Sequence, residues 1–152
     1  MDELVKIVLK KYNLEFKHVH PVQKGYRNKS YLVDLTDGSR INLIIYKREP
    51  GILNKILSAH AIANVLKSEI PVRYPLKPIL QIKENLYAGV YNYLPGSTIP
   101  WESYTMDHLK LLGENMNIIH YLGKAKSKFH KNFFISEAEN LQSILSRVNK
   151  YF

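Results

Sequence analysis

The 152-residue sequence contains no cysteine. This absence excludes disulfide scaffolds, thiol nucleophiles and thiolate metal sites, and it is typical of proteins from a reducing compartment. No apolar run approaches the roughly 20 residues that cross a membrane, so we expect no membrane contact. Acidic residues are scarce: 22 Lys and Arg against 13 Asp and Glu give a formal net charge of +9. An anionic partner fits this balance, whether a nucleotide, a phosphate or a polynucleotide.

Apolar residues recur with helical and strand periods in an order that predicts an α+β fold. Helical periodicity marks 2–12, 52–67, 106–121 and 136–151, whereas strand-like runs mark 16–23, 29–35, 40–47, 79–83 and 86–93. Pro21 favours an edge position for the first strand, and the almost continuously apolar run 40–47 favours a central one. We therefore predict a mostly antiparallel five-stranded sheet with one packed helix, followed by a hinge and helices.

Four short stretches carry a likeness to a known family: Gly25–Val33, Ile70–Leu76, Tyr91–Gly96 and Leu109–His120. They contain, in order, a Gly-x-x-Asn turn, a proline-rich connector, a hinge and an apolar helix start. With this order and spacing, the chain resembles the aminoglycoside/choline phosphotransferase family, whose fold is similar to that of protein kinases. The resemblance implies a kinase-like small lobe over 1–95, a hinge or linker over 96–105, and the incomplete helical start of a large lobe over 106–152.

The same resemblance implies a nucleotide site between the glycine turn and the hinge, with ATP and Mg²⁺ as cofactors. A glycine turn lets backbone N–H groups approach phosphate oxygens, and a hinge strand can offer main-chain groups to a purine edge. Apolar side chains would cover the purine, and a basic side chain would contact the phosphates. The implied cofactor-binding residues are Gly25, Asn28, Ser30, Val33, Lys47, Asn92, Tyr93 and Leu94.

One departure from the family pattern concerns the phosphate-binding cation. In the family, a basic residue on the third strand grips the phosphates and pairs with a helix glutamate. Here Ile44 stands at the basic position, and the helix 52–67 contains no acid, with the partner position falling near 58–60. Loss of both members is coherent, because an unpartnered buried charge is costly. Three readings stay open: Lys47 reaches the phosphates through a bulge, the nucleotide is held differently, or it is not held.

A second departure concerns catalysis. Phosphoryl transfer needs an aspartate to accept the hydroxyl proton, and an asparagine and an aspartate to hold Mg²⁺. The family carries them on a His-x-Asp-x-x-x-x-Asn loop and a later Asp, but no aspartate follows Asp107 here. We therefore predict no catalytic residue and no metal ligand in this chain. It would be a truncated product, a fragment or one half of a split protein, completed by a large-lobe polypeptide.

Three functional hypotheses follow. The first is the nucleotide-binding portion of a cytoplasmic, ATP-dependent phosphotransferase that acts on a small-molecule hydroxyl and is inactive alone. The second is a non-catalytic kinase-like binding module, which Ile44 and the acid-free helix favour. The third is a basic nucleic-acid-binding domain. The eleven tyrosines give this third hypothesis little support, because several of them, among them Tyr31, Tyr46, Tyr91 and Tyr93, fall inside predicted strands, where half-buried tyrosine is common.

Overall fold

The structure, a computed structural model, describes residues 2–22, 28–97 and 99–126. The chain divides into two compact units, Met1–Ser103 and Tyr104–Phe152, and each is described by itself. None of the helices in the described ranges is both long and apolar enough to cross a membrane.

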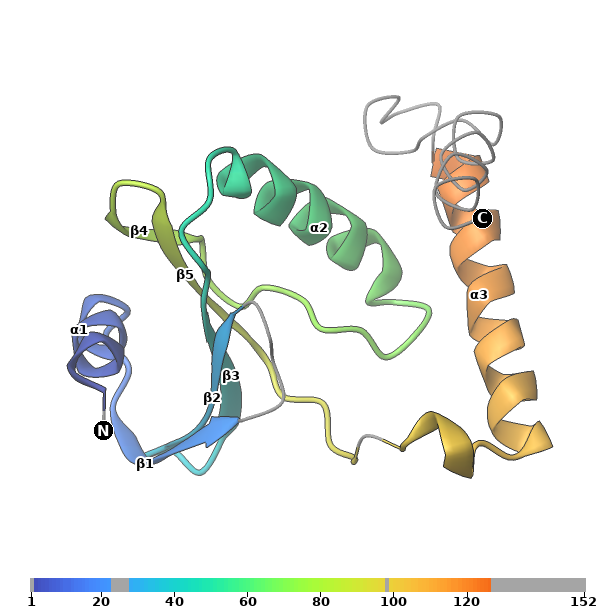
Figure 1. The fold of residues 1–152 in the computed structure, drawn as a ribbon, viewed down its shortest axis with the longest axis horizontal. Helices are drawn as coiled ribbons and strands as arrows, with labels where there is room; N and C mark the ends of the chain where they lie inside the picture. The colour runs from blue at the N-terminus through green and yellow to red at the C-terminus, as the bar shows by residue number, and fades with distance from the viewer. Residues whose placement is uncertain (1, 23–27, 98, 127–152) are drawn as a thin grey trace, which may run out of the picture. The chain divides into compact units, whose positions relative to one another are not determined.

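The first unit is built on a five-stranded antiparallel sheet (Figure 1). Its strands are β1 (Phe16–Val22), β2 (Lys29–Leu35), β3 (Arg40–Ile45), β4 (Leu80–Lys83) and β5 (Leu86–Asn92). Their spatial order is β1-β2-β3-β5-β4, and every neighbouring pair is antiparallel. The predicted edge position of the first strand and the central position of the third are both confirmed. β3 is shorter than predicted, because the chain leaves the sheet after Ile45.

Helix α1 (Glu3–Lys11) covers one face of the sheet and forms the main core with it. Asp2 caps the helix, with its carboxylate accepting a hydrogen bond from the Leu4 main-chain N at 3.1 Å. The apolar stripe of α1 meets side chains from β2, β3 and β5. The buried members of this core are Val5, Val8, Leu9, Tyr12, Tyr31, Val33, Leu35, Ile41, Leu43, Ile45, Ala88 and Val90.

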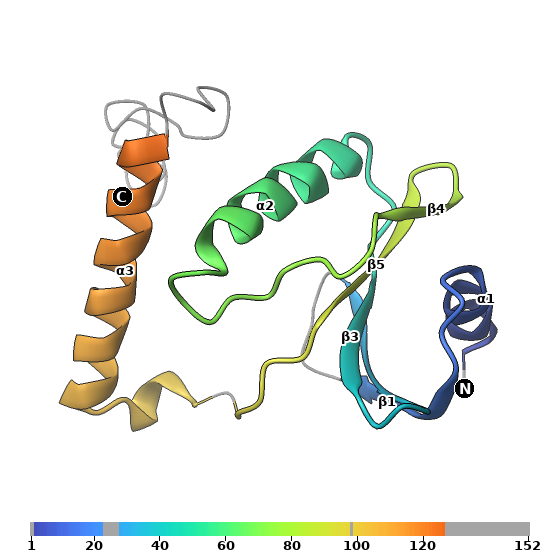
Figure 2. The ribbon, with the colours of Figure 1, turned by 180° about the vertical axis from the view of Figure 1, so that it is seen from behind.

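Helix α2 (Ile52–Leu66) lies on the opposite side of the sheet from α1, as Figures 1 and 2 both show. Side chains alternate along a strand, so the residues between those of the α1 core face α2. The strand register places Ile44 opposite Gly89 and Asn42 opposite Tyr91 on this second face. We call this surface the α2 face.

The chain leaves β5 through an extended segment and a short 3₁₀ turn, η1 (Trp101–Ser103), before the second unit. The described part of that unit is helix α3 (Met106–Lys126), which runs five residues past its predicted end. The helix predicted over 136–151 lies outside the described residues.

Candidate functional site

A cavity of about 280 Å³ lies between the start of β2, the chain after β3 and the first half of α2. Asn28 stands just before β2, and its side-chain Oδ1 accepts a hydrogen bond from the main-chain N of Lys47 at 3.1 Å. This bond joins the segment entering β2 to the segment leaving β3. The cavity is lined by Asn28, Tyr46, Lys47, Glu49, Ile52, Lys55, Ile56 and Ala59.

Two of the residues predicted to contact phosphate, Asn28 and Lys47, therefore lie together at this cavity. The Lys47 side chain is exposed, and Ser30 is half-buried in β2 opposite Ile44. Gly25, which is also predicted to contact the phosphates, lies outside the described residues.

Next to the cavity, a neutral hydrogen-bond network joins α2 to the sheet. The Nε2 atom of His60 lies 2.7 Å from the Tyr91 hydroxyl, which also hydrogen-bonds the Tyr46 hydroxyl. Burial lowers the pKa of His60 and raises the pKa of both tyrosines, so all three groups are held neutral near pH 7. Ile44 is buried on the same face. An apolar side chain and uncharged hydrogen bonds thus stand near the positions where the family has its cation and acid.

The last residue of β5, Asn92, is fully engaged in holding the chain. Its side chain accepts a hydrogen bond from the Tyr74 N at 2.6 Å and donates one to the Val72 O at 3.1 Å. Its main-chain N donates to the Tyr74 O, and its main-chain O accepts from the Asn42 side chain at 3.1 Å. The main-chain groups of Asn92 are therefore already occupied.

The next two residues follow the end of the β3–β5 ladder, whose last pair is Ile41 and Asn92. Outside that ladder, the main chain of Tyr93 and Leu94 makes no hydrogen bond with another described residue. The Arg40 guanidinium lies 5.3 Å above the Tyr93 ring, and its Nε donates to Asp34 at 2.6 Å. Hydrogen bonds from Arg40 and then from His20 hold the pKa of the Asp34 carboxyl below its usual value. This charged cluster fixes the ring of Tyr93 against the edge of the α2 face.

Between the hinge and the cavity, the exposed apolar surface belongs to a different β2 residue than predicted. Val33 has no exposed surface, because the alternation of β2 places it under α1 with Tyr31 and Leu35. Its neighbour Leu32 is half-buried on the α2 face. The same alternation, read from the sequence, separates Leu32 from the buried set but does not say which face a helix covers.

The hinge and the cavity lie at opposite ends of β3. Ile41 pairs with Asn92 beside the hinge, and Ile45 pairs with Lys29 next to Asn28. Four residues of antiparallel strand span about 14 Å. This separation is comparable to the length of an extended nucleotide, with a base at one end and phosphates at the other.

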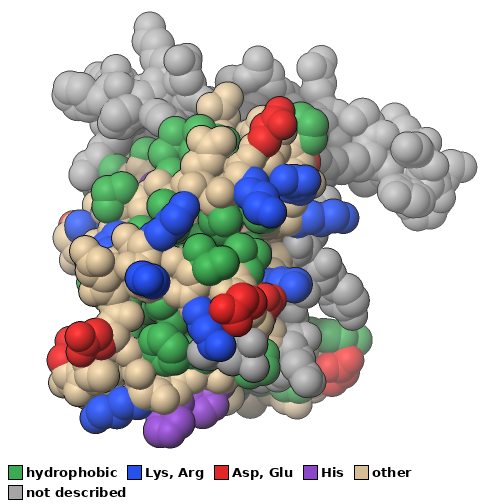
Figure 3. Space-filling model, turned by 90° about the vertical axis from the view of Figure 1, so that its left-hand side faces the viewer, with side chains coloured by type: hydrophobic (Ala, Val, Ile, Leu, Met, Phe, Trp, Pro, Cys, Tyr) green, Lys and Arg blue, Asp and Glu red, His purple; other side chains and the backbone are tan. Residues whose placement is uncertain are grey.

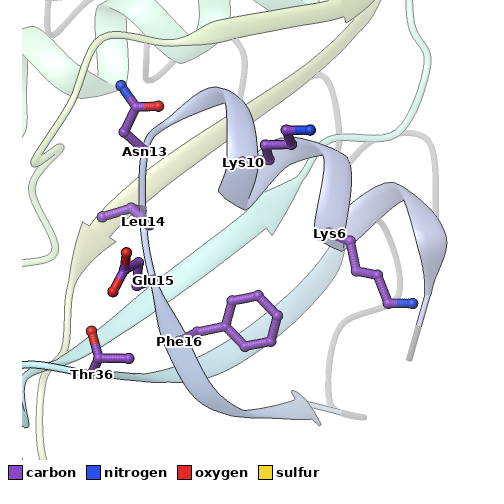
Figure 4. A pocket seen from close by; sticks show the side chains of 7 residues that line it. All are labelled: Lys6, Lys10, Asn13, Leu14, Glu15, Phe16 and Thr36. Atoms are coloured by element: carbon purple, nitrogen blue, oxygen red, sulfur yellow. The ribbon is translucent and has the colours of Figure 1, made fainter.

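A second cavity, of about 590 Å³, opens on the α1 side of the sheet (Figure 4). Lys6 and Lys10 come from α1, 13–15 from the segment before β1, Phe16 from the start of β1, and Thr36 from the β2–β3 turn. None of the predicted site residues that the structure describes lines it. Figure 3 shows that basic side chains on this side are scattered among hydrophobic and acidic ones. The described residues of this face therefore form no continuous basic surface for a polynucleotide, and nucleic-acid binding stays a prediction.

The described residues fit a nucleotide better than a metal ion. The α2 face combines hinge main chain at its edge with apolar surface and basic side chains, which suit a base and phosphates. In the same ranges there is no group of three or more His, Cys, Asp or Glu side chains that could hold a metal ion. No step of the chemistry is therefore assigned to Mg²⁺ held by these residues.

Comparison with known proteins supports the fold. No protein-family model matches the chain, and no curated protein sequence matches it. Its structure is similar to a solved structure described as amicoumacin kinase hAmiN in complex with AMP-PNP, Ca²⁺ and Ami, with a TM-score of 0.63 and 20% sequence identity. The match covers 91% of this chain and 43% of that kinase, so the chain spans less than half of the kinase's length. The five-stranded sheet and its helices thus form an α+β, kinase-like small-lobe fold, which confirms the predicted fold class.

Proposed function

We propose that this chain is the nucleotide-binding portion of an ATP-dependent small-molecule phosphotransferase similar to the aminoglycoside/choline kinases. One observation carries the proposal. The hinge main chain at Tyr93 and Leu94 and the cavity at Asn28 and Lys47 lie at the two ends of β3, about one nucleotide length apart. The kinase-like fold, shared with a kinase in complex with AMP-PNP, supports the same assignment.

Each part of the site has a role in this proposal. The main chain of Tyr93 and Leu94 hydrogen-bonds the purine edge, and Leu32 packs on the purine ring in place of the buried Val33. Asn92 contributes by fixing the hinge, because its own polar groups are engaged.

The phosphates lie at the other end of the site. There, Asn28, Ser30 and Lys47 act together with the turn around Gly25 to contact them. The distance between the two ends leaves room for the ribose along the α2 face.

The remaining chemistry belongs to residues outside these 152. The catalytic base, the Mg²⁺ ligands and the surface that chooses the hydroxyl acceptor would come from a complementary large lobe, with 1–95, 96–105 and 106–152 as small lobe, linker and large-lobe start. The AMP-PNP and Ca²⁺ named for the similar kinase support nucleotide and divalent-metal use by a complete enzyme. A cytoplasmic location is part of the same proposal.

A second candidate function is a kinase-like module that binds without phosphoryl transfer. The neutral network of Tyr46, Tyr91 and His60 favours it, because these described residues join α2 to the sheet by uncharged hydrogen bonds. Supplying the large-lobe polypeptide in trans separates the two: transfer of phosphate from ATP supports the phosphotransferase, and nucleotide binding without transfer supports the module.

Thermal denaturation with and without ATP tests nucleotide binding. For the wild-type chain we expect the melting temperature to rise by several degrees at saturating ATP, since a ligand at 100 times its Kd stabilises by about 2.7 kcal/mol. Leu32→Arg should abolish the rise by blocking the purine surface. Leu57→Arg, an equally large change at an exposed position of α2, should keep it. No shift of the wild type at millimolar ATP, or an equal shift in Leu32→Arg, would contradict the proposal.

A further inference from the structure

Among the described residues that line the cavity between β2, β3 and α2, one basic side chain has no role in the proposed function. This is Lys55, in the first half of α2. Resting on the proposed function, we infer that Lys55 is a second phosphate-binding residue of the same site, and that Glu49 holds its ammonium group until the phosphates of a nucleoside triphosphate replace that carboxylate.

The geometry places both groups at the cavity. The Lys55 Nζ forms an ion pair with the Glu49 carboxylate, and both side chains line the cavity together with Asn28 and Lys47. The Lys55 side chain is 65% exposed and that of Glu49 is 40% exposed. An ion pair this exposed stabilises the protein by less than about 1 kcal/mol, so its exchange for a stronger anion costs little.

Charge favours a polyphosphate in this exchange. Among the described residues, two lysines and one glutamate line the cavity, and together they carry a net charge of +1. A triphosphate carries several negative charges and accepts charge-assisted hydrogen bonds, so it outcompetes a single carboxylate for both ammonium groups. Ile52, Ile56 and Ala59 line the same cavity and reduce the water that would screen these bonds.

Size restricts which part of the ligand enters. About 280 Å³ is near the lower end of ligand pockets, which begin at about 300 Å³. The cavity therefore suits the phosphates alone, while the base lies toward Tyr93 at the other end of β3. Through Lys55, helix α2, which contains no acidic residue, would thus supply the cation that β3 lacks at Ile44.

Calorimetric titration of the full chain with tripolyphosphate, ATP and adenosine tests this inference. In Lys55→Gln we expect affinity for tripolyphosphate and ATP to fall about tenfold, with adenosine binding unchanged. In Glu49→Gln, which removes the competing carboxylate, we expect affinity for both phosphate ligands to rise about threefold. Lys10→Gln, an equally exposed lysine change on the α1 side, is the matched control and should bind all three ligands as the wild type does.

The outcomes distinguish a failure of this inference about Lys55 from a failure of the proposed nucleotide-binding function. If Lys55→Gln binds ATP as well as Lys10→Gln does, or if Glu49→Gln weakens binding, the inference is wrong while the nucleotide site stands. If the wild type binds neither adenosine nor ATP, the proposed function itself is contradicted. Circular dichroism confirms that each variant is folded, and Glu49→Gln tests the exchange even where Lys55→Gln fails to fold.

Discussion

At the scale of single residues, Gly89 and Tyr91 show how tightly the α2 face is packed. They are two positions apart on β5, so their side chains point to the same face. A Cβ on Gly89 would lie 2.5 Å from the Tyr91 hydroxyl oxygen and 2.7 Å from a carbon of its ring. Hydrogen bonds to Tyr46 and His60 fix that ring, so it has little freedom to move aside.

We therefore expect Gly89→Ala to lower the free energy of unfolding by about 1–3 kcal/mol, the usual cost of overpacking a core. Urea denaturation measures it. In a Tyr91→Leu background the cost should largely disappear, because the opposing ring is gone. Gly113→Ala is the control: apart from the adjoining backbone of α3 itself, no described heavy atom lies within 4 Å of its added Cβ, so that change should be neutral or stabilise by up to about 1 kcal/mol. Equal losses in the two variants would show that packing against Tyr91 is not the cause.

At the level of individual site residues, the sequence predicted only part of what the structure shows. The alternation of β2 separates Val33 from Leu32 correctly, but periodicity alone does not tell which face lies under α1. The engagement of Asn92 depends on Val72 and Tyr74, about 20 positions earlier, and no local pattern signals such a contact. Lys55 was not predicted as a site residue for a similar reason, since only the folded chain brings it to the cavity beside Asn28.

At the scale of elements, a side-chain hydroxyl at the end of α1 joins this helix to the edge of the sheet formed by β5 and β4. The Tyr12 hydroxyl lies 2.9 Å from both the Pro78 O and the Ala88 O and donates to them. It thereby connects the helix to the connector before β4 and to β5. Burial raises the pKa of Tyr12 to about 12.

We expect Tyr12→Phe to lower the free energy of unfolding by about 1–2 kcal/mol, because the buried Ala88 O and the partly buried Pro78 O lose their shared donor. The pH dependence gives a second readout. With a folded-state pKa above the ordinary value of 10, the stabilisation by Tyr12 is complete below pH 10 and is lost as the pH rises toward 12. Urea denaturation from pH 8 to pH 11 should therefore show a shallower decline for Tyr12→Phe than for the wild type. Parallel curves would contradict this role.

Element positions were largely predictable because each carries a local signal. Alternating apolar residues predicted β2, the continuous apolar run predicted central β3, and Pro21 predicted an edge strand. Boundaries were less accurate: β3 ends at Ile45 rather than at Lys47, where a hydrogen bond to Asn28 takes the place of strand pairing. The ends of strands depend on contacts with side chains from other elements, and the periodicity of the sequence carries no information about those contacts.

At the scale of the whole molecule, the core cluster and all five strands belong to the unit Met1–Ser103. We therefore expect a polypeptide of residues 1–103 to fold by itself. Its urea unfolding should be a single cooperative transition, and its amide NMR spectrum should be well dispersed. It should also keep the ATP-dependent thermal shift, because every described residue of the proposed site lies within it. A gradual transition with poorly dispersed amides would show that the second unit is needed for folding.

The four hydrogen bonds of Asn92 have a mechanical consequence. Three of these bonds, together with the bond from the Leu76 N to the Val90 O, join the segment that follows α2 to β5, so a displacement of either is transmitted to the other. Tyr74, whose ring lies under the Lys67 ammonium at 5.2 Å, sits at this junction and gives it an intrinsic fluorophore. A shift of α2 when its cavity is filled would therefore reach the start of the linker without any rearrangement of the sheet.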